Sequence, residues 1–322
     1  MRICLTQSTI SRVYLIPTAT MLTMITSTKR FAVLFCLFLC ATTIRAELSV
    51  VDETGREVRL ANPARRIISL APHVTELLFA AGAGERVIGV VSYSDYPEAA
   101  LKLPQVGGYH NLDLEKIVGL KPDLIVAWSS GNRQTHLEKL EALGIPVYLT
   151  EPRTLSDIAH SIEMLGRLAG SENIAMQEAE AFRTRLRTLQ ERFSNRPSVR
   201  MMYQIWDQPL RTINGQHLIS DVINLCGGKN IFSDLPQLAP VIGVESVLAA
   251  DPEAIVASGM GEARPDWLDR WRAWPNLQAT KMGNLFFIPP QLVQRHTPRI
   301  LDGATQLCDF LENARAKRPS LP

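Results

Sequence analysis

Apolar and polar residues follow one another along the chain in short units, each of which predicts a strand and then a helix. The run "RRIISLAP" is rich in β-branched residues and stops at Pro72, and "HVTELLFAAGAG" continues with helical spacing until Gly82. Further apolar runs of strand length lie in both halves of the chain: "RVIGVV", "PDLIVAW" and "IPVYLT" in the first half, and "VRMMYQIW", "PEAIVASG" and "NLFFIP" in the second. Apolar strands that alternate with helices are typical of a parallel sheet covered on both faces. The pattern therefore predicts an α/β fold made of two lobes with mainly parallel sheets.

A single long helix is predicted between the two lobes, over residues 171–196. This segment contains no glycine or proline, begins at Ser171, whose hydroxyl is expected to cap the helix, and ends before Pro197. A helix of about 25 residues spans roughly 38 Å, which is enough to reach from one lobe to the other. Its apolar residues recur every three or four positions and form one stripe: Ala179, Phe182, Leu186, Leu189 and Phe193.

The position of this helix suggests the division of the chain. We expect residues 47–153 to form the N-terminal lobe, residues 154–197 a helical connection that contains the backbone helix, and residues 198–322 the C-terminal lobe. An ordinary surface helix inside one domain is the weaker alternative, because the strand and helix units restart after it.

One phrase occurs in both lobes. "EKIVGLKPDLIVA", from Glu115, and "ESVLAADPEAIVA", from Glu245, share the start of a helix, the proline that ends it and the strand that follows. The two lobes therefore look like copies of one another. A glutamate in a first helical turn has a simple explanation, since it offsets the helix macrodipole by about 0.3 to 1 kcal/mol. A functional explanation is that each lobe displays one exposed carboxylate, which pairs with arginines on two copies of a partner subunit.

Residues 1–46 are predicted to be an export signal rather than part of the fold. Two basic residues precede the apolar run "FAVLFCLFLCATTI", and the small Ala46 follows at a position suited to signal peptidase. The apolar run is too short to cross a bilayer, so a retained membrane anchor is the weaker alternative. Residues 1–20 lie upstream of a signal of ordinary length, which leaves Met21 and Met24 open as alternative starts.

Removal of this signal changes the charge and the cysteine count. Residues 1–46 carry five of the 34 basic residues and none of the 32 acidic ones, so the rest of the chain has a net charge of −3. Nucleic acid is therefore not expected as a partner. Only Cys226 and Cys308 remain, and an even pair in an oxidising compartment suggests one disulfide. Two buried reduced thiols stay open as the alternative, because the sequence does not show that the sulfurs are close.

The chain contains none of the familiar catalytic motifs. "GAGERVIG" follows a helix instead of opening one after a strand, so it is not a dinucleotide fingerprint, and HExxH, CxxC and GxSxG do not occur. We therefore expect no enzyme, no catalytic residue, no metal site and no cofactor. A secreted enzyme on a doubly wound α/β fold is a remote alternative, which would need a cluster of acid, base or metal-binding residues.

Several segments resemble the periplasmic cobalamin-binding proteins of ABC importers, a branch of the wider group that also carries ferric siderophores and haem. The resemblance rests on "RRIISLAPHVTELLFAAGAGERVIGVVSYSDYPEAA", "LDLEKIVGLKPDLIVAW", "LCGGKNIF" and "RHTPRI", and it runs from about Arg65 to Leu311. It implies two α/β lobes joined by one long helix, with the ligand in the cleft between them. The implied function is capture of a corrinoid in the Gram-negative periplasm and its delivery to a dimeric inner-membrane permease. The protein would be a monomer, and cobalamin its cargo rather than a cofactor.

The resemblance places three aromatic residues of the N-terminal lobe at this cleft: Tyr93 of "SYSDYP", Tyr109 of "GGYHNLDLE" and Trp128 of "IVAWSSG". A corrinoid is a broad, mostly apolar disc edged with amides, which flat amphipathic rings can cover while offering hydrogen bonds. Packing in the core is the alternative for each ring. Relatives have a tryptophan where Tyr109 stands, so we expect a smaller stacking area and one added hydroxyl there.

In the C-terminal lobe, the resemblance implies that Trp206 of "YQIWDQPLRT" and Arg295 with His296 of "QRHTPRI" contact the ligand. A guanidinium suits the amides or the phosphate of a corrinoid. Relatives have a tryptophan near the position of Ala239, which this chain lacks, and Trp206 is the residue that could compensate. The resemblance also gives Glu115 and Glu245 the role of docking carboxylates for arginines of the two-fold permease. It pairs Cys226 with Cys308 in a disulfide.

Three histidines lie where an imidazole could approach the axial face of a cobalt or iron centre. His73 follows the first strand, His110 adjoins Tyr109, and His217 begins the matching helix of the C-terminal lobe. Imidazole is a common metal ligand, but no pair has the spacing of a zinc site, and a lone histidine is more often a cap or a solvated side chain. We count His73 among the ligand-binding residues and leave direct ligation open. The alternative function is a receptor for haem or a ferric siderophore, which should prefer a tyrosine or histidine ligand or a basic cleft.

Overall fold

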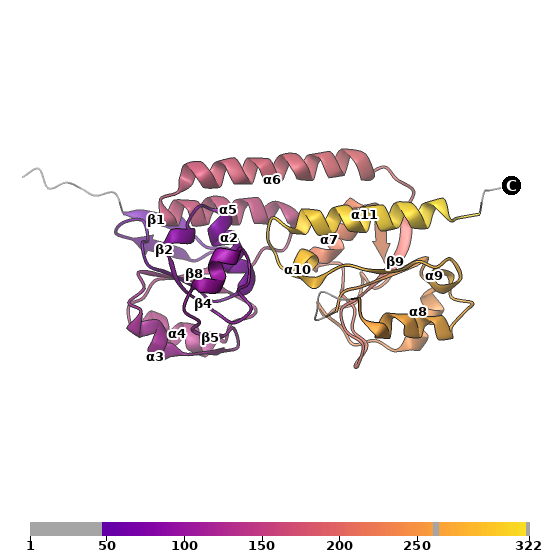
Figure 1. Cartoon of the computed structure of the whole chain (residues 1–322), viewed down its shortest axis with the longest axis horizontal. Helices are drawn as coiled ribbons and strands as arrows, with labels where there is room; N and C mark the ends of the chain where they lie inside the picture. The colour runs from indigo at the N-terminus through magenta and orange to yellow at the C-terminus, as the bar shows by residue number, and fades with distance from the viewer. Residues whose placement is uncertain (1–46, 260–263, 320–322) are drawn as a thin grey trace, which may run out of the picture. The chain divides into compact units, whose positions relative to one another are not determined.

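Two parallel sheets of four strands each organise the chain (Figure 1). The structure, a computed structural model, describes residues 47–259 and 264–319, and the export signal expected over residues 1–46 lies outside them. The first sheet has the strand order β4-β3-β7-β8 and the second has β10-β9-β11-β12, with every neighbouring pair parallel. We call the first sheet with its helices the first lobe, and the second sheet with its helices the second lobe. The predicted α/β class with mainly parallel sheets is confirmed.

Strands and helices alternate in both lobes, as the apolar runs predict. The first lobe and the two helices after it contain β1 (Leu48–Val51), β2 (Glu57–Leu60), β3 (Ile67–Ser69), α2 (Pro72–Ala80), η1 (Gly84–Arg86), β4 (Val87–Val90), η2 (Glu98–Lys102), β5 (Gly107–Gly108), β6 (Asn111–Leu112), α3 (Leu114–Gly119), β7 (Leu124–Trp128), α4 (Gln134–Ala142), β8 (Val147–Thr150), α5 (Leu155–Ala169) and α6 (Glu172–Phe193). The second lobe contains β9 (Val199–Gln204), α7 (Leu218–Leu225), β10 (Gly228–Asn230), α8 (Val244–Ala250), β11 (Ala254–Ala257), η3 (Asp266–Ala273), α9 (Gln278–Lys281), β12 (Leu285–Phe287), α10 (Pro290–Val293) and α11 (Ile300–Ala316). Two small antiparallel pairs, β1-β2 and β5-β6, complete the first lobe.

The inner faces of both sheets share one apolar core. On β7, Leu124 and Val126 belong to this shared core, whereas Ile125 and Ala127 point to a separate core on the opposite face of the first sheet. Strand β11 alternates in the same way between the shared core and a third core on the outer face of the second sheet. The alternation follows from the two-residue period of a strand. The apolar layer therefore continues from one lobe to the other without a polar gap.

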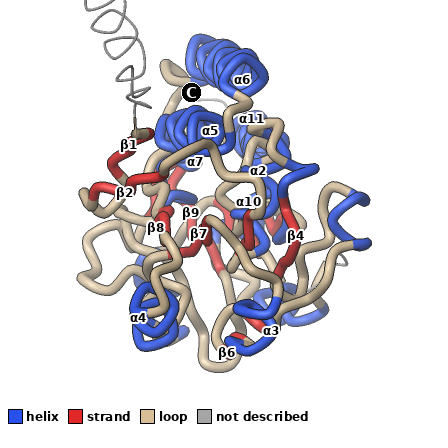
Figure 2. Tube along the Cα trace, turned by 90° about the vertical axis from the view of Figure 1, so that its left-hand side faces the viewer, coloured by secondary structure: helices blue, strands red, loops and turns tan. Residues whose placement is uncertain are grey.

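Helix α6 runs along this shared core. It packs against α5 over most of its length, and it contacts α2 of the first lobe as well as α7 and α11 of the second. Figures 1 and 2 both show α6 lying over α5 and α11. The five apolar residues of the predicted stripe are all buried, and burial of each leucine or phenylalanine contributes about 1.5 to 3 kcal/mol. Among the described residues, no helix, α6 included, has both the length and the apolar character that crossing a membrane requires.

Ser171 does not cap α6 in the way the sequence predicts. The residue occupies the N-cap position, but its hydroxyl donates a hydrogen bond to the carbonyl oxygen of Ala81 at 2.6 Å and makes no cap bond. Ala81 is the residue that follows α2. The hydroxyl therefore links the beginning of α6 to the end of α2, because an acceptor distant in the sequence competes successfully with the local N–H groups.

The repeated phrase has the same local structure in both lobes. Helices α3 and α8 each end shortly before a proline. The acidic residue directly after that proline, Asp123 or Glu253, accepts a hydrogen bond from a backbone N–H at the start of a neighbouring strand. These donors are Arg66 in the first lobe, at 2.9 Å, and Arg200 in the second, at 3.1 Å. The guanidinium of each arginine also donates to a carbonyl oxygen at the end of the repeated helix, which is α3 for Arg66 and α8 for Arg200. The two lobes thus share individual hydrogen bonds as well as the order of their elements.

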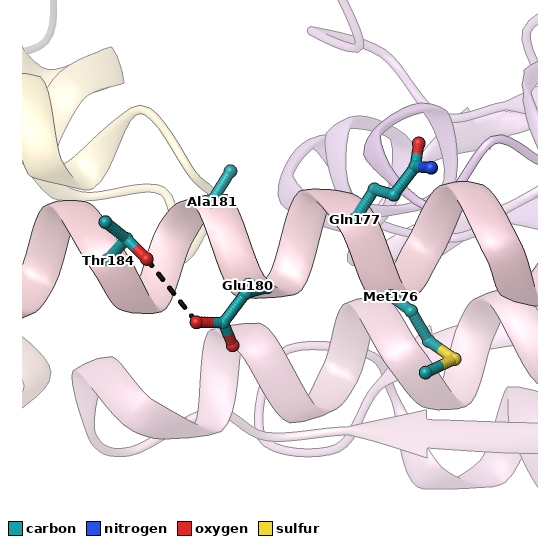
Figure 3. Close-up of a pocket in the computed structure, with 5 residues that line it drawn as sticks. All are labelled: Met176, Gln177, Glu180, Ala181 and Thr184. Atoms are coloured by element: carbon teal, nitrogen blue, oxygen red, sulfur yellow. Dashed lines mark hydrogen bonds between the residues drawn. The ribbon is translucent and has the colours of Figure 1, made fainter.

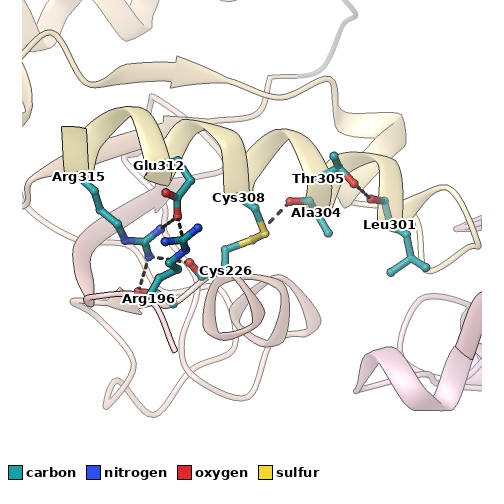
Figure 4. The surroundings of a disulfide bond; sticks show 9 residues. Arg196, Cys226, Leu301, Ala304, Thr305, Cys308, Glu312 and Arg315 are labelled. Atoms are coloured by element: carbon teal, nitrogen blue, oxygen red, sulfur yellow. Dashed lines mark hydrogen bonds and ion pairs between the residues drawn. A yellow bond between two sulfur atoms is a disulfide. The ribbon is translucent and has the colours of Figure 1, made fainter. Parts of the chain in front are cut away.

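A disulfide joins Cys226 to Cys308, as expected, and the alternative of two reduced thiols is not realised (Figure 4). Cys226 ends α7 and Cys308 lies in the middle of α11, and both side chains are fully buried. Nearby, Arg315 of α11 donates to the carbonyl oxygen of Cys226 at 2.7 Å. The covalent bond and this hydrogen bond both hold α11 against α7.

Glu53 is a half-buried acid that ties the β1-β2 hairpin to the rest of the first lobe. Its carboxylate accepts hydrogen bonds from the backbone N–H of Glu151 and from the hydroxyl of Ser161 on α5. Burial is the main cause that raises the pKa of Glu53 to about 7, and the nearby charges of Asp157 and Glu151 raise it further. The carboxyl group is therefore partly protonated at neutral pH.

Replacement of Glu53 by glutamine should stabilise the protein only at high pH. The pKa of about 7 lies above the ordinary value of 4.5, so the stability associated with this group is complete below pH 4.5 and is lost as the pH rises through 7. Glu53→Gln cannot ionise, and we expect it to raise the free energy of unfolding by about 1 to 3 kcal/mol at pH 8 and to change it little at pH 4.5. Urea unfolding at both pH values measures this, with exposed Glu85→Gln as the control. An equal effect at both pH values would contradict the explanation.

Loss of the disulfide should cost much of the stability. The bond closes a loop across 82 residues of sequence, for which restriction of the unfolded chain predicts a contribution of about 4 kcal/mol. We expect the double variant Cys226→Ala/Cys308→Ala and the reduced wild-type protein to show similar decreases in urea unfolding. Dithiothreitol should leave the double variant unaffected. A wild-type protein that keeps its full stability after reduction would refute this account.

Candidate ligand-binding site

The predicted residues of the first lobe follow the carboxyl ends of its parallel strands. Tyr93 comes after β4, Trp128 is the last residue of β7, and His73 lies in the first turn of α2, directly after β3. Parallel strands end at one edge of a sheet, which is where open α/β sheets bind ligands. The strand pattern therefore places these three side chains at the same edge.

Aromatic and imidazole rings form a row that begins in the first lobe and ends in the second. The centroids of neighbouring rings lie between 4.0 and 6.5 Å apart, and the two rings at the crossing between the lobes, His73 and His296, are 5.6 Å apart. We call these residues the ring row; in order they are His110, Tyr109, Trp128, His73, His296 and His217. The structure thus brings together four of the predicted ligand-binding residues, from both lobes.

Two residues that sequence reasoning did not identify fix Trp128: Asn132 binds its backbone, and Gly131 leaves room for its ring. The buried Asn132 accepts a hydrogen bond from the backbone N–H of Trp128 at 2.7 Å, and its amide donates to the carbonyl oxygens of Leu70 and Tyr109, both at 2.9 Å. A Cβ atom at Gly131 would lie 1.8 Å from the indole ring. Only glycine therefore allows the ring its present position, and Asn132 joins the two aromatic segments to the end of β3.

Tyr109 lies at the tip of a short hairpin. It is followed by His110, and the two residues form the turn between β5 and β6. The hairpin is tight because Gly107 has a φ of +101°, and a Cβ atom there would lie 2.5 Å from the carbonyl oxygen of Asn111. Glycine is required at this position, and the sharp turn is what presents the Tyr109 ring to Trp128.

Three imidazoles of the ring row, those of His73, His217 and His296, are uncharged at neutral pH. Burial lowers the pKa of His217 and of His296 to about 4, and burial together with the His296 and Arg295 charges lowers the pKa of His73 well below its ordinary value. Three nitrogen atoms of the row are buried without a hydrogen-bond partner in the described part of the chain: His73 Nε2, His296 Nδ1 and Trp128 Nε1. An unsatisfied buried polar atom costs about 1 to 3 kcal/mol, so these atoms are expected to pair with ordered water or with a ligand.

His217 has a structural role of its own. It is the N-cap of α7, and its Nδ1 accepts a hydrogen bond from the backbone N–H of Ile219 at 3.1 Å. This is the cap that the sequence left open as the alternative to metal ligation. Across the described ranges, no three histidine, cysteine, aspartate or glutamate residues are arranged to hold a metal ion.

Tyr93 and Arg295 meet outside the ring row. The Tyr93 side chain is 76% exposed, and its backbone carbonyl oxygen accepts a hydrogen bond from Arg295 Nη2 at 3.2 Å. The same guanidinium forms ion pairs with Glu76 and Asp95. The terminal nitrogens of Arg295 are thus already bound within the protein.

Trp206, the remaining predicted residue, is not part of the ring row. It follows β9, is 38% exposed, and its indole N–H donates to the carbonyl oxygen of Gln208 at 2.9 Å. Gln208 lines a pocket of about 380 Å³ in the second lobe, which three further tryptophans also line: Trp267, Trp271 and Trp274. Sequence reasoning overlooked these three, although their spacing of four and three residues in "WLDRWRAW" was the available indication.

A second hollow, of about 630 Å³, lies on α6 and belongs to no predicted site (Figure 3). All of its lining residues come from this one helix and are exposed, so it is a feature of the surface with few converging polar groups. The lining residues are Met176, Gln177, Glu180, Ala181 and Thr184.

Glu115 and Glu245 occupy equivalent positions in the two lobes. Each is exposed in the first turn of its helix, α3 or α8, and neither forms an ion pair with another described residue. The buried residues Ile117 and Val247 anchor the two helices at matching positions. The lobes therefore present two similar acidic helix ends to solvent.

Comparison with known proteins identifies the family of this chain. A family model described as "Periplasmic binding protein" matches residues 67–292. The vitamin B12-binding protein of Vibrio cholerae is 39% identical over 254 residues, which cover 79% of this chain and 91% of that protein. The protein of the same name from Vibrio vulnificus is 37% identical over 259 residues, which cover 80% and 94%.

Solved structures show the same architecture. The crystal structure of the periplasmic vitamin B12 binding protein BtuF of Vibrio cholerae matches with a TM-score of 0.73 and 38% identity, covering 79% of this chain and 98% of that one. The periplasmic haem-binding protein RhuT from Roseiflexus sp. RS-1 matches with a TM-score of 0.68 at 23% identity, covering 78% and 99%, and this likeness concerns the fold alone. With a family model that spans most of the chain and relatives of this identity and coverage, the chain belongs to the periplasmic binding protein family.

Proposed function

We propose that this chain is the substrate-binding protein of an ABC importer, which captures cobalamin and delivers it to an inner-membrane permease. The observation that carries the proposal is the ring row, because it offers aromatic and imidazole faces from both lobes. The names of the relatives that are 37 to 39% identical support the choice of ligand.

The chemistry of the ring row suits a corrinoid. The rings of Tyr109 and Trp128 are tilted by 38° to each other with centroids 6.0 Å apart, and they offer apolar area to a broad, flat ligand. His73 and His296 stay uncharged, so an apolar ligand face can cover them without the cost of removing water from a charged imidazolium. We assign Tyr93 and Trp206 to the edges of this binding surface.

The same proposal includes the location of the protein, its oligomeric state and the boundaries of its lobes. Residues 1–46 would direct export into the periplasm of a Gram-negative cell and then be removed. The mature protein would act as a monomer, perform no reaction and carry cobalamin as cargo. We also infer that the lobes are the expected segments, residues 47–153 and 198–322, joined through residues 154–197.

Glu115 and Glu245 would dock this protein on the permease. Their helices have the same place in each lobe, so the two carboxylates suit a receiving surface with two-fold symmetry and one arginine site on each half. Exposed charges of this kind steer association and set its orientation without contributing to the affinity for the ligand.

Haem or a ferric siderophore is the second candidate ligand. The observation in its favour is the pair of neighbouring, neutral imidazoles of the buried His73 and the half-buried His296, since neutral imidazole is a common iron ligand. The visible spectra of corrinoids and haem differ, so one binding experiment separates the two candidates.

Cyanocobalamin should stay bound to the mature protein through desalting. We expect Trp128→Ala to weaken binding about tenfold to a hundredfold, since loss of a central aromatic contact commonly costs 1.4 kcal/mol or more. Gly131→Ala should weaken it as well, because the added methyl group displaces the indole. Trp267→Ala, a substitution of the same type outside the ring row, is the control. Isothermal titration and visible spectra measure binding; absence of corrinoid bands together with a retained haem Soret band would favour the second candidate.

Charge reversal at both docking positions should separate transport from ligand binding. We expect Glu115→Arg/Glu245→Arg to reduce cobalamin uptake at least tenfold in cells that depend on this protein, at unchanged affinity for cyanocobalamin. Glu172→Arg is the matched control, because Glu172 is also an exposed glutamate in a first helical turn and loses the same interaction with the helix dipole. Uptake at the wild-type rate by the double variant would remove both carboxylates from the mechanism.

A further inference from the structure

Four charged side chains from the two lobes meet between α2 and the start of α11. Glu76 and Asp95 belong to the first lobe, and Arg295 and Arg299 belong to the second. The Arg299 guanidinium binds both oxygens of Glu76, with Nε 2.9 Å from Oε2 and Nη2 2.6 Å from Oε1. Arg295 Nη1 donates to Glu76 Oε1 at 2.9 Å, and the same guanidinium donates to both oxygens of Asp95. We call these four residues the interlobe charge cluster.

Glu76 fixes the geometry of this cluster. Its side chain is only 2% exposed, and the side chains of Arg295 and Arg299 are 17% and 19% exposed. A buried carboxylate has to keep its partners, because an unpaired charge in the protein interior is strongly unfavourable. The bidentate pair with Arg299 also fixes the relative orientation of the two planar groups. The buried carboxylate therefore determines where both guanidinium groups lie.

The two arginines hold the segment that carries Tyr93. Arg295 Nη2 donates to the backbone carbonyl oxygen of Tyr93 at 3.2 Å and to Asp95 Oδ2 at 3.1 Å. The Arg299 guanidinium lies 4.0 Å from the centroid of the Tyr96 ring, in cation-π geometry. Residues 93–96 of the first lobe are thus held at three points by the second lobe.

Tyr93 needs such support because of its backbone. Its φ of +66° lies in the left-handed region, which residues other than glycine seldom adopt. Its ring is 76% exposed and cannot stabilise this conformation by packing. Within the first lobe, the Ser94 hydroxyl accepts a hydrogen bond from Thr75 at 3.0 Å, which holds the segment one residue further on. The bond from Arg295 is the contact that reaches Tyr93 itself.

We propose that Arg295 is a positioning residue, which Glu76, itself bound by Arg299, holds in place so that it fixes the Tyr93 backbone in the conformation from which the Tyr93 ring meets the ligand. The inference rests on the proposed function, since it assigns Tyr93 to the corrinoid surface. It differs from direct recognition of the ligand by Arg295, because both terminal nitrogens of the guanidinium already donate to first-lobe oxygens. The ligand then contacts Tyr93, and Arg295 acts through that residue.

A double-mutant cycle with cyanocobalamin distinguishes the two roles. We expect Arg295→Gln and Tyr93→Ala each to weaken binding about tenfold, and the double variant to bind no more weakly than the weaker single variant. Direct contact of Arg295 with the ligand predicts independent losses, which multiply to about a hundredfold. Arg185→Gln, which removes an arginine from the exposed ion pair with Asp302, is the control. Multiplied losses would overturn the proposal.

Amide hydrogen exchange of the ligand-free protein gives an independent measurement. In Arg295→Gln, exchange in residues 92–97 should rise at least tenfold, whereas exchange in the β5-β6 hairpin should stay as in the wild type. Asp95→Asn should produce the same local change, and it serves as the second variant if Arg295→Gln does not fold, because the Asp95 side chain is 52% exposed. Unchanged exchange in residues 92–97 of the folded variants would overturn the proposal.

The two measurements also separate this inference from the proposed function. If the wild-type protein binds no cyanocobalamin, the proposed function fails, while the exchange experiment still decides whether Arg295 positions residues 93–96. If the wild-type protein binds but the losses multiply, the proposed function stands and the positioning role fails.

Discussion

The shared apolar core beneath α5, α6 and α11 is the constraint on which the rest of the structure depends. Both sheets turn one face toward this core, so neither lobe can move away from α6 without exposing apolar side chains to water. The lobes are therefore coupled mechanically as well as by the chain. This continuous layer, together with the interlobe charge cluster, fixes the spacing of the ring row to which both lobes contribute. Such preorganisation reduces the conformational entropy that the protein loses when a ligand binds.

Helix α2 connects two different environments in the region between the lobes. His73, in its first turn, belongs to the ring row, and Glu76, three residues later, belongs to the interlobe charge cluster. Residues three apart lie on one side of a helix, so a single short helix places an apolar surface beside a charged one. The cluster contains two positive and two negative charges, which offset each other beside the uncharged imidazoles of His73 and His296. The cluster therefore adds no net charge to this part of the region between the lobes.

Much of the fold was predictable from local patterns. The apolar runs identified the central strands, because a strand that is buried on both faces appears in the sequence as a continuous apolar run. The repeated phrase from Glu115 and Glu245 predicted matching helices and strands, and the structure extends the match to the hydrogen bonds of Asp123 and Glu253. The helix over Glu172–Phe193 was predictable because its stripe of apolar residues is regular and no proline interrupts it.

The details of the candidate site were less predictable, because they depend on partners distant in the sequence. The family resemblance implied that Arg295 contacts the ligand, and only the fold shows that Glu76 and Asp95 occupy its guanidinium. Ser171 had the right position for a cap, but the carbonyl of Ala81 competes for its hydroxyl. Nothing in the local sequence distinguishes Asn132, because its amide contacts segments distant in the chain: Leu70 after β3 and Tyr109 in the β5-β6 hairpin.

The disulfide also affects the contact between the lobes. Arg299 directly precedes α11, and Cys308 in the middle of that helix is bonded to α7. Arg299, which binds Glu76 of the first lobe, therefore lies at the start of a helix that the disulfide fixes to the second lobe. Reduction of the disulfide would free α11 from its covalent link to α7 and loosen the helix end that carries Arg299, while the shared apolar core still holds the two lobes together.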